Sequence, residues 1–118
     1  MIEVYGIKNC NTVKKALDWF AEKNIPYIFH DFKKEGVCME KLSRWEQYFG
    51  WETLLNKKGT TWRNLSEETK QQTNNIPAAI KLMSAQSSII KRPVVETSDG
   101  TPLSLGFNEE TYNNIFLK

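Results

Sequence analysis

The sequence predicts an α/β fold, an α/β sandwich on a small mixed four-stranded sheet with an all-helical block inserted between its halves. Three observations predict it. A strand, a helix and a second strand follow one another within about the first 32 residues, and two further strands and a last helix follow Arg92. From about residue 39 to 88 there are helical patterns and turns but no convincing strand. The order β-α-β, helices, β-β-α therefore predicts one domain over residues 1–118.

The first half has the pattern of a βαβ unit. Residues 2–7 are mostly β-branched or aromatic, which is typical of a buried strand. An amphipathic helix follows, with its apolar stripe formed by Val13, Ala16, Leu17, Phe20 and Ala21. Asn24 and Pro26 end this helix, and residues 27–32 form a second strand before a charged turn at residues 33–36. The two strands are expected to be parallel, with a right-handed crossover.

In the middle and at the end of the chain, helix caps and one turn predict the secondary structure. Three apolar residues share a helical face that Gly50 ends: Leu42, Trp45 and Phe49. A short turn of helix is expected at residues 51–55, Ser66 caps a weak helix, and Pro77 lies in the first turn of another. Asp99-Gly100 then predicts a hairpin between strands at 93–97 and 101–105. Asn108 caps the last helix, whose apolar face is Tyr112, Ile115 and Phe116.

Composition excludes several classes of protein. A net charge of +2 gives no reason to expect a nucleic-acid or membrane partner, and no apolar run approaches the length of a membrane span. The first residues lack the basic start of a signal peptide, so we expect a cytoplasmic protein with reduced thiols. Two cysteines and one histidine offer neither a disulfide framework nor a zinc spacing. No bound metal or cofactor is expected.

Cys10 is the candidate nucleophile. It lies where the first strand passes into the first helix, so unpaired N–H groups and the helix dipole should stabilise its thiolate, with help from Lys8 and Lys14. The same corner suits an oxyanion, and Asn9, Asn11, Thr12 and Lys14 are its candidate anion-binding residues. On spacing alone, a half-buried structural cysteine fits equally well.

Arg92-Pro93 opens the third strand and is the second candidate site. The planar fork of Arg92 suits an anionic substrate, although the sequence alone favours an exposed salt-bridging arginine. Pro93 is permitted at a strand start because it need not donate to the ladder.

Three other features have structural explanations. Cys38 is expected to be a small apolar filler; it becomes a resolving partner for Cys10 only if their Cα atoms lie within ~7 Å. His30 is expected to be a hydrogen-bonded structural residue. Core packing explains the tryptophans of the helical block better than a partner surface does: Trp45, Trp51 and Trp62.

Four motifs occur together in the order of a known family: Cys10-Asn11-Thr12; Gly50-Trp51 with Leu54-Leu55-Asn56-Lys57-Lys58-Gly59-Thr60-Thr61-Trp62-Arg63; Arg92-Pro93-Val94; and Leu105-Gly106-Phe107. Over essentially its full length the chain resembles the ArsC/Spx family of thioredoxin-like proteins, and within it the small YffB-like proteins. The resemblance implies a thioredoxin-like fold with a helical insertion and Cys10 as the redox-active nucleophile. It also implies that Arg92 binds an anion and precedes a cis-proline, Pro93, next to the sulfur of Cys10.

Differences from the family pattern affect which of the family's activities we expect of this chain. In arsenate reductases of this family the thiolate attacks arsenate, and glutathione and glutaredoxin complete the reduction. Their loop has a histidine four residues before the cysteine, where this chain has Gly6, and one of their further arginines falls at Asn56. Activity on arsenate itself is therefore not expected. Spx regulators typically have a redox switch with the pattern C-x-x-C. In a pattern that begins at Cys10 the fourth residue here is Val13, which argues against an Spx-type switch at this loop.

Two functions follow as hypotheses. The first is a cytoplasmic thiol-dependent oxidoreductase acting on a small-molecule thiol or oxyanion, with glutathione as co-substrate and glutaredoxin or thioredoxin as candidate partners. The alternative is a non-catalytic, Spx-like regulatory protein that binds RNA polymerase.

Overall fold

The computed structural model describes residues 1–117 and divides the chain into two compact units. Met1–Glu35 and the chain from Arg92 onward form the first, called here the sheet unit. Gly36–Lys91 forms the second, called here the helical unit. The sequence places its inserted helices at about 39–88, inside these bounds. That the two units fold as one domain stays a prediction.

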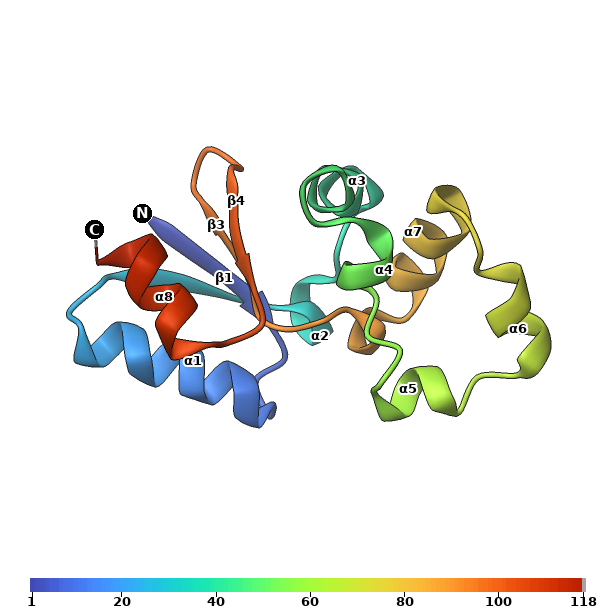
Figure 1. The fold of residues 1–118 in the computed structure, drawn as a ribbon, viewed down its shortest axis with the longest axis horizontal. Coiled ribbons are helices and arrows are strands. Elements are labelled where there is room, and N and C mark those ends of the chain that lie inside the picture. Colours follow the sequence, from blue (N-terminus) through green and yellow to red (C-terminus); the bar gives the residue numbers. More distant parts are fainter. Residues whose placement is uncertain (118) are drawn as a thin grey trace. The chain divides into compact units, whose positions relative to one another are not determined.

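The sheet unit contains the predicted mixed sheet of four strands, in the order β2-β1-β3-β4 (Figure 1). β1 (Ile2–Gly6) pairs in parallel with β2 (Tyr27–Asp31), as the βαβ pattern predicts. On its other side β1 pairs antiparallel with β3 (Val94–Thr97), which pairs antiparallel with β4 (Pro102–Leu105). The Asp99-Gly100 turn between β3 and β4 requires its glycine, because Gly100 has φ +88°. The predicted fold class is confirmed.

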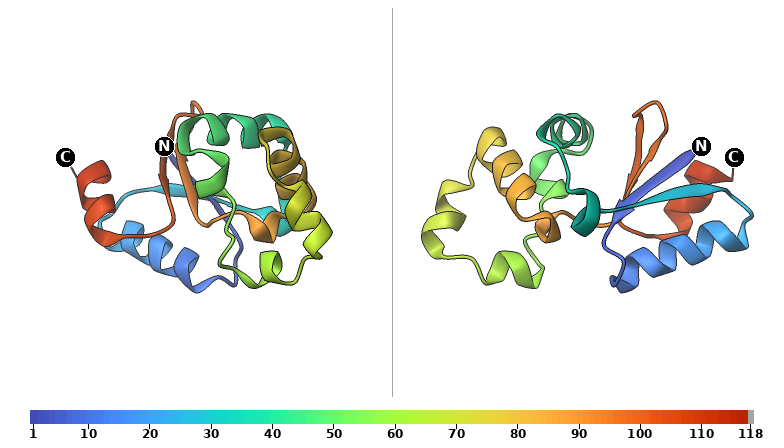
Figure 2. Two further views of the ribbon diagram at one scale, coloured as in Figure 1. Left: turned by 45° about the vertical axis from the view of Figure 1, so that its right-hand side comes forward. Right: turned by 180° about the vertical axis from the view of Figure 1, so that it is seen from behind.

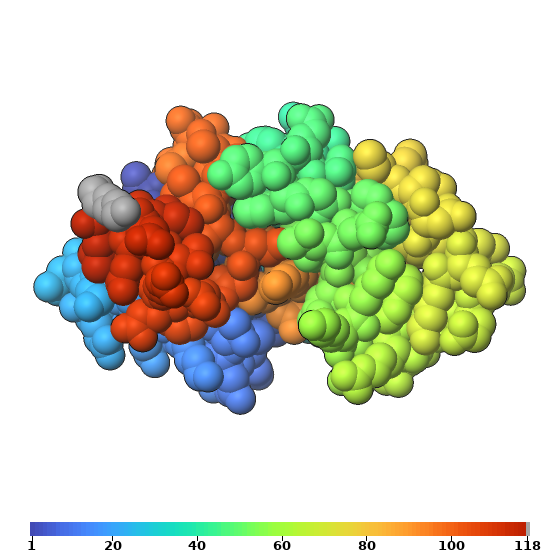
Figure 3. All heavy atoms as spheres, in the orientation of Figure 1, coloured from blue at the N-terminus to red at the C-terminus, as the bar shows by residue number. Residues whose placement is uncertain are grey.

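Two helices, α1 (Asn11–Glu22) and α8 (Glu109–Phe116), cover one face of this sheet (Figure 2). Their side chains pack on Val4 and Val95. The indole of Trp19 lies edge-on to the rings of Phe20 and Tyr112, with ring centroids 5.4 and 5.2 Å away. The atoms of the two helices lie against each other in the space-filling view (Figure 3). This aromatic layer is the core of the sheet unit.

The buried stripe of α1 differs from the predicted one at two positions. Ala21 is exposed, whereas Trp19 is 4% exposed. Burying the indole of Trp19 removes far more apolar surface from water than burying the methyl group of Ala21. The buried face of α1 is therefore the one that includes Trp19. Asn24 ends the helix as predicted, in the left-handed conformation with φ 57°.

The second strand ends one residue earlier than predicted. Phe32 begins α2 (Phe32–Glu35), a single helical turn where the sequence predicts the end of the strand and a charged turn. The Asp31 carboxylate accepts the N–H of Lys33 at 2.9 Å, which satisfies a donor at the start of this turn. Phe32 is buried, and this burial holds the turn in place.

The helical unit contains α3 (Met39–Phe49), α4 (Trp51–Leu54), α5 (Thr60–Arg63), α6 (Glu67–Gln72), α7 (Ile76–Ala85) and a 3₁₀ turn (Ser87–Ile89). α3 packs against α4 and α7 around Leu42 and Trp45, which are both fully buried. Gly50 ends α3 with φ +85°, and the Ser66 hydroxyl caps α6 by accepting the N–H of Thr69, both as predicted. Within residues 1–117 no helix combines the length and the apolar character that crossing a membrane requires.

The end of the polar run together with Trp62 and Arg63 forms α5, which the sequence does not predict. The Lys57 ammonium lies over the rings of both Trp51 and Trp62, 5.3 and 5.5 Å from their centroids. Arg63 donates to the Lys58 carbonyl at 2.8 Å. Trp45 is a core residue, as expected, but Trp51 and Trp62 are only half-buried and flank a lysine. These contacts between neighbouring residues order a segment that has no apolar periodicity.

Candidate active site

Cys10 is the N-cap residue of α1 and has extended backbone angles, φ −103° and ψ 124°. Its carbonyl accepts the first helical hydrogen bond, from the N–H of Lys14 at 3.0 Å. Its own N–H donates to the carbonyl of Ile7 at 3.2 Å, which closes the turn after β1. The neutral thiol makes no well-aligned cap hydrogen bond, yet the N–H groups of Thr12 and Val13 face the sulfur and would stabilise a negative charge there.

Gly6 sets how closely the end of β1 approaches this helix. A Cβ at Gly6 would lie 2.8 Å from Cγ2 of Val13, closer than such atoms approach in proteins. Val13 is fully buried and β-branched, so its methyl groups have little freedom to move aside. Glycine at this position therefore lets the first turn of α1, and Cys10 with it, sit against the end of the strand.

Arg92 and Cys10 come together although they lie 82 positions apart in the sequence. β3 pairs with β1 so that Val94 lies opposite Tyr5. Continuing this register by one residue sets Pro93 opposite Gly6, at the end of the sheet where Cys10 lies. The side chain of Arg92 makes a hydrogen bond to Cys10. The Arg92–Pro93 peptide bond is cis, as predicted.

The pKa of Cys10 is lowered from its ordinary value. Partial burial raises it, but this effect is outweighed by the N–H of Val13, the hydrogen bond and charge of Arg92, and the N–H of Thr12. The sequence pointed to Lys8 and Lys14 as the cations nearby. Both are exposed, where solvent screens their charge, and the positive charge that acts on the thiol is that of Arg92.

The other residues of the corner lie on its surface. Asn9, Asn11, Thr12 and Lys14 are exposed around Cys10. Thr12 stabilises the thiolate through its backbone N–H. That these residues bind an anion with their side chains stays a prediction, as does the same role for Arg92 and Pro93.

Cys38 differs from its predicted environment. It is exposed and caps the N-terminus of α3 in the helical unit, so the expectation of an apolar filler is wrong. The N-cap position of a helix has extended backbone angles, and those of Cys38 are φ −81° and ψ 154°. Its role as a resolving cysteine stays a prediction.

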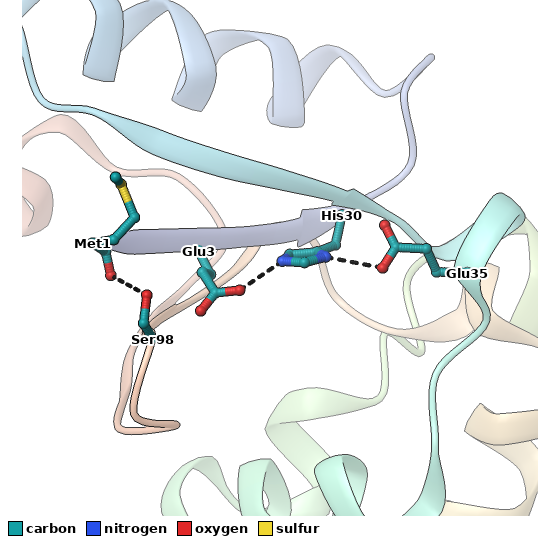
Figure 4. A network of polar contacts seen from close by, with 5 residues as sticks. All are labelled: Met1, Glu3, His30, Glu35 and Ser98. Carbon is teal, nitrogen blue, oxygen red and sulfur yellow. Dashed lines mark hydrogen bonds and ion pairs between the residues drawn. The ribbon is translucent and has the colours of Figure 1, made fainter.

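His30 is hydrogen-bonded on both sides, as expected of a structural residue (Figure 4). Its Nε2 lies 2.7 Å from Oε1 of Glu3, and its Nδ1 lies 2.9 Å from Oε1 of Glu35. The ring also stacks on Tyr5, with centroids 4.4 Å apart. A neutral imidazole has one N–H, so both contacts to ionised carboxylates are hydrogen bonds only when the ring is protonated. Partial burial lowers the pKa of His30, but Glu35 and Glu3 outweigh it and the pKa is raised.

The sequence gives no sign of a groove of about 410 Å³ in the sheet unit. Leu17, Tyr27 and Phe29 line its apolar part. Tyr27 and Phe29 are spaced in the sequence as two residues on one face of a strand. The sequence does not give the order of the strands, and this order places β2 at an edge of the sheet. Among the described residues no cluster of three or more histidine, cysteine or acidic side chains could hold a metal ion.

Comparison with known proteins agrees with the fold and with the family resemblance. The model of the ArsC family matches residues 5–115. An uncharacterised protein of Haemophilus influenzae is 45% identical over 116 residues, covering 98% of this chain and 99% of that protein. A solved structure named YFFB (PA3664) protein is 43% identical, covers 98% of both chains and superposes with a TM-score of 0.88.

A further solved structure, an arsenate reductase (ArsC) related protein from Brucella melitensis, is 44% identical. The match covers 98% of this chain and 93% of that one, with a TM-score of 0.76. These similarities extend over the whole sheet unit and the whole helical unit. The chain belongs to the ArsC family, with the thioredoxin-like fold of its arsenate reductase-related members.

Proposed function

We propose that this protein is a thiol-dependent oxidoreductase in which Cys10 is the nucleophile. The observation that carries the proposal is the environment of the Cys10 sulfur: two backbone N–H groups and the Arg92 guanidinium act on it, and its pKa is lowered. A lowered pKa increases the fraction of thiolate at neutral pH, and the thiolate is the form that attacks a disulfide. Membership of an arsenate reductase-related family supports the same class of chemistry.

The proposed reaction is a thiol–disulfide exchange in two steps. The Cys10 thiolate attacks one sulfur of a disulfide; a bond forms between these two sulfurs, the original S–S bond breaks, and the second sulfur leaves as a thiolate. A free thiol, with glutathione as the candidate co-substrate, then attacks the sulfur that is bound to Cys10; these two sulfurs form a bond and the Cys10 thiolate is released. The proton of the attacking thiol goes to the thiolate that left in the first step. One disulfide and one thiol enter, and one disulfide and one thiol leave.

Arg92 would hold the anionic part of a partner next to the sulfur, either a glutathione carboxylate or an oxyanion. Arsenate is the less favoured oxyanion substrate, because the reductases of the family have a histidine where this chain has Gly6. A side chain at position 6 would collide with Val13. The exchange partner in the cell would be glutathione itself, or glutaredoxin or thioredoxin acting on the mixed disulfide.

Incubation of the reduced protein with glutathione disulfide, followed by intact and peptide mass spectrometry, tests this proposal. We expect one glutathione on Cys10 in the wild type and in Cys38→Ser, and none at that position in Cys10→Ser. Absence of the adduct on Cys10 across the pH range, while Cys38 reacts, would contradict the proposal.

A reductase panel then separates substrates. Arsenate, glutathione disulfide and a peptide disulfide are offered in turn with glutathione, and Cys10→Ser is run beside the wild type. Loss of turnover in Cys10→Ser is expected with disulfide substrates. No turnover with any of them, together with stoichiometric co-purification of RNA polymerase, would favour the regulatory alternative instead.

A further inference from the structure

The groove in the sheet unit lies between α1 and β2 and includes Lys8, from the turn that leads to Cys10. Its apolar part is lined by the half-buried side chains of Leu17 on α1 and of Tyr27 and Phe29 on β2. Its charged part includes Lys8, two residues before Cys10, and Asp31 at the end of β2. A solvent-open volume of about 410 Å³ has room for more than one amino-acid side chain. The groove therefore has charged residues at its end toward the candidate nucleophile and an apolar surface that extends away from it along β2.

The strand that forms one wall of this groove, β2, is one of the two edge strands of the sheet. β2 pairs only with β1, and within residues 1–117 the backbone of residues 27–30 has no hydrogen bond beyond that pairing. Edge strands are commonly protected by charged side chains, a proline, a bulge or a short length. Within Tyr27–Asp31, β2 has no lysine, proline or bulge, and its acidic residue, Asp31, lies at the end of the strand. A strand added outside β2 would lie beside Ile28, which is 45% exposed.

The direction of β2 sets which end of the groove faces the active-site corner. β1 and β2 are parallel, and Asp31 lies opposite Gly6. The carboxyl end of β2 is thus at the same end of the sheet as the turn that leads to Cys10. The apolar end, at Tyr27, lies four residues away along the strand, roughly 13 Å at 3.3 Å per residue.

We propose that the substrate of Cys10 is a disulfide carried on a polypeptide, and that an extended segment of this polypeptide adds to β2 as a further strand. This inference rests on the function proposed above. An extended backbone is the partner that satisfies the outward N–H and C=O groups of an edge strand, and every second side chain would enter the groove. A small disulfide has too little backbone to use this edge. The sulfur exchange is the one already described.

Paired substrates test the inference. One is a peptide of about seven residues with alternating valine and threonine and a cysteine at one end, activated as a mixed disulfide with a chromophoric thiol. The other is N-acetylcysteine amide activated in the same way. The rate constant for reaction with Cys10 is measured in Cys38→Ser. Because one buried apolar side chain contributes about a tenfold gain in binding, we expect the peptide to react at least about tenfold faster at low concentration.

One change in the protein and one in the peptide should lower the ratio of the peptide's rate constant to that of the small disulfide. Leu17→Lys places a charge in the groove, and Ile76→Lys, at a position of the helical unit that is 44% exposed, is the matched control. N-methylation of alternate peptide residues removes main-chain donors without altering the protein. We expect one alternate set to abolish the gain and the other set to preserve it.

Equal rate constants for the two disulfides, or a gain that survives N-methylation of both alternate sets, would overturn the inference. So would light scattering that shows a dimer of this chain broken by Leu17→Lys, because a second copy would then occupy the edge. If Cys10 reacts with neither disulfide, the proposed function fails separately. The addition of a peptide strand to β2 is then tested by itself with the S-methylated peptide, and it is supported if amide NMR shifts concentrate at residues 27–31 and overturned if they do not.

Discussion

Gly6 and Val13 determine how the candidate nucleophile is presented. We expect Gly6→Ala to lower the free energy of unfolding by about 1–3 kcal/mol, because the added methyl lies 2.8 Å from a buried, branched side chain. Urea unfolding measures this cost. The double variant Gly6→Ala/Val13→Ala relieves the collision, so the two substitutions should cost less together than the sum of their separate effects. Additive costs would show that the contact does not limit the approach of α1 to β1.

Single residues also show what can be inferred from sequence. The position of Cys10 before an amphipathic helix is recognisable from local order alone, and that of Arg92 because a proline follows it at a strand start; their roles stay predictions. The charge that acts on Cys10 was assigned to lysines close in sequence. The structure has Arg92 in that role, because sheet register, which a single sequence does not report, brings it there.

At the scale of elements, His30 joins β1, β2 and α2 through two carboxylates. Its folded pKa is raised, so the stability it contributes is fully present below its unfolded pKa of about 6.5 and is lost as the pH rises through the folded value. We expect His30→Gln to cost roughly 0.5–1 kcal/mol at pH 5.5 and less at pH 8.5. Urea unfolding of both proteins at the two pH values gives this difference.

Glu35→Gln and Glu3→Gln are the controls for this prediction. Glu35 is 52% exposed and Glu3 17% exposed as side chains, so the loss of Glu3 should have the larger effect at pH 5.5. An effect of His30→Gln that is constant with pH, or that grows as the pH rises, would show that the imidazolium is not what holds these elements.

Elements with a regular apolar period or a strong cap were predictable, and those made by local polar contacts were not. α1, α3 and α8 follow from their apolar stripes, and the hairpin follows from Asp99-Gly100. α5 depends instead on a lysine between two tryptophans, and α2 on one buried phenylalanine. Neither contact has a period that a sequence window would reveal. The groove was missed because it depends on which strand lies at the edge.

For the whole molecule, the open question is whether the sheet unit and the helical unit unfold together. Phe20 is fully buried among the aromatic rings of the sheet unit, and Phe20→Ala should cost about 3–5 kcal/mol. If the chain is one cooperative domain, native-state hydrogen exchange will show the same loss of protection in β1 and in α3. Unchanged protection in α3 would mean that the helical unit has its own stability.

The measurement that tests the central claim most directly is the pH dependence of Cys10 alkylation by iodoacetamide, followed by peptide mass spectrometry. In the wild type and in Cys38→Ser we expect a midpoint below the ~8.5 of an ordinary thiol, because the helix N–H groups and Arg92 stabilise the thiolate. Arg92→Gln should raise that midpoint, and Lys14→Gln should leave it almost unchanged. A Cys10 midpoint at or above that of an ordinary thiol, unaffected by Arg92→Gln, would contradict the claim that this corner activates Cys10.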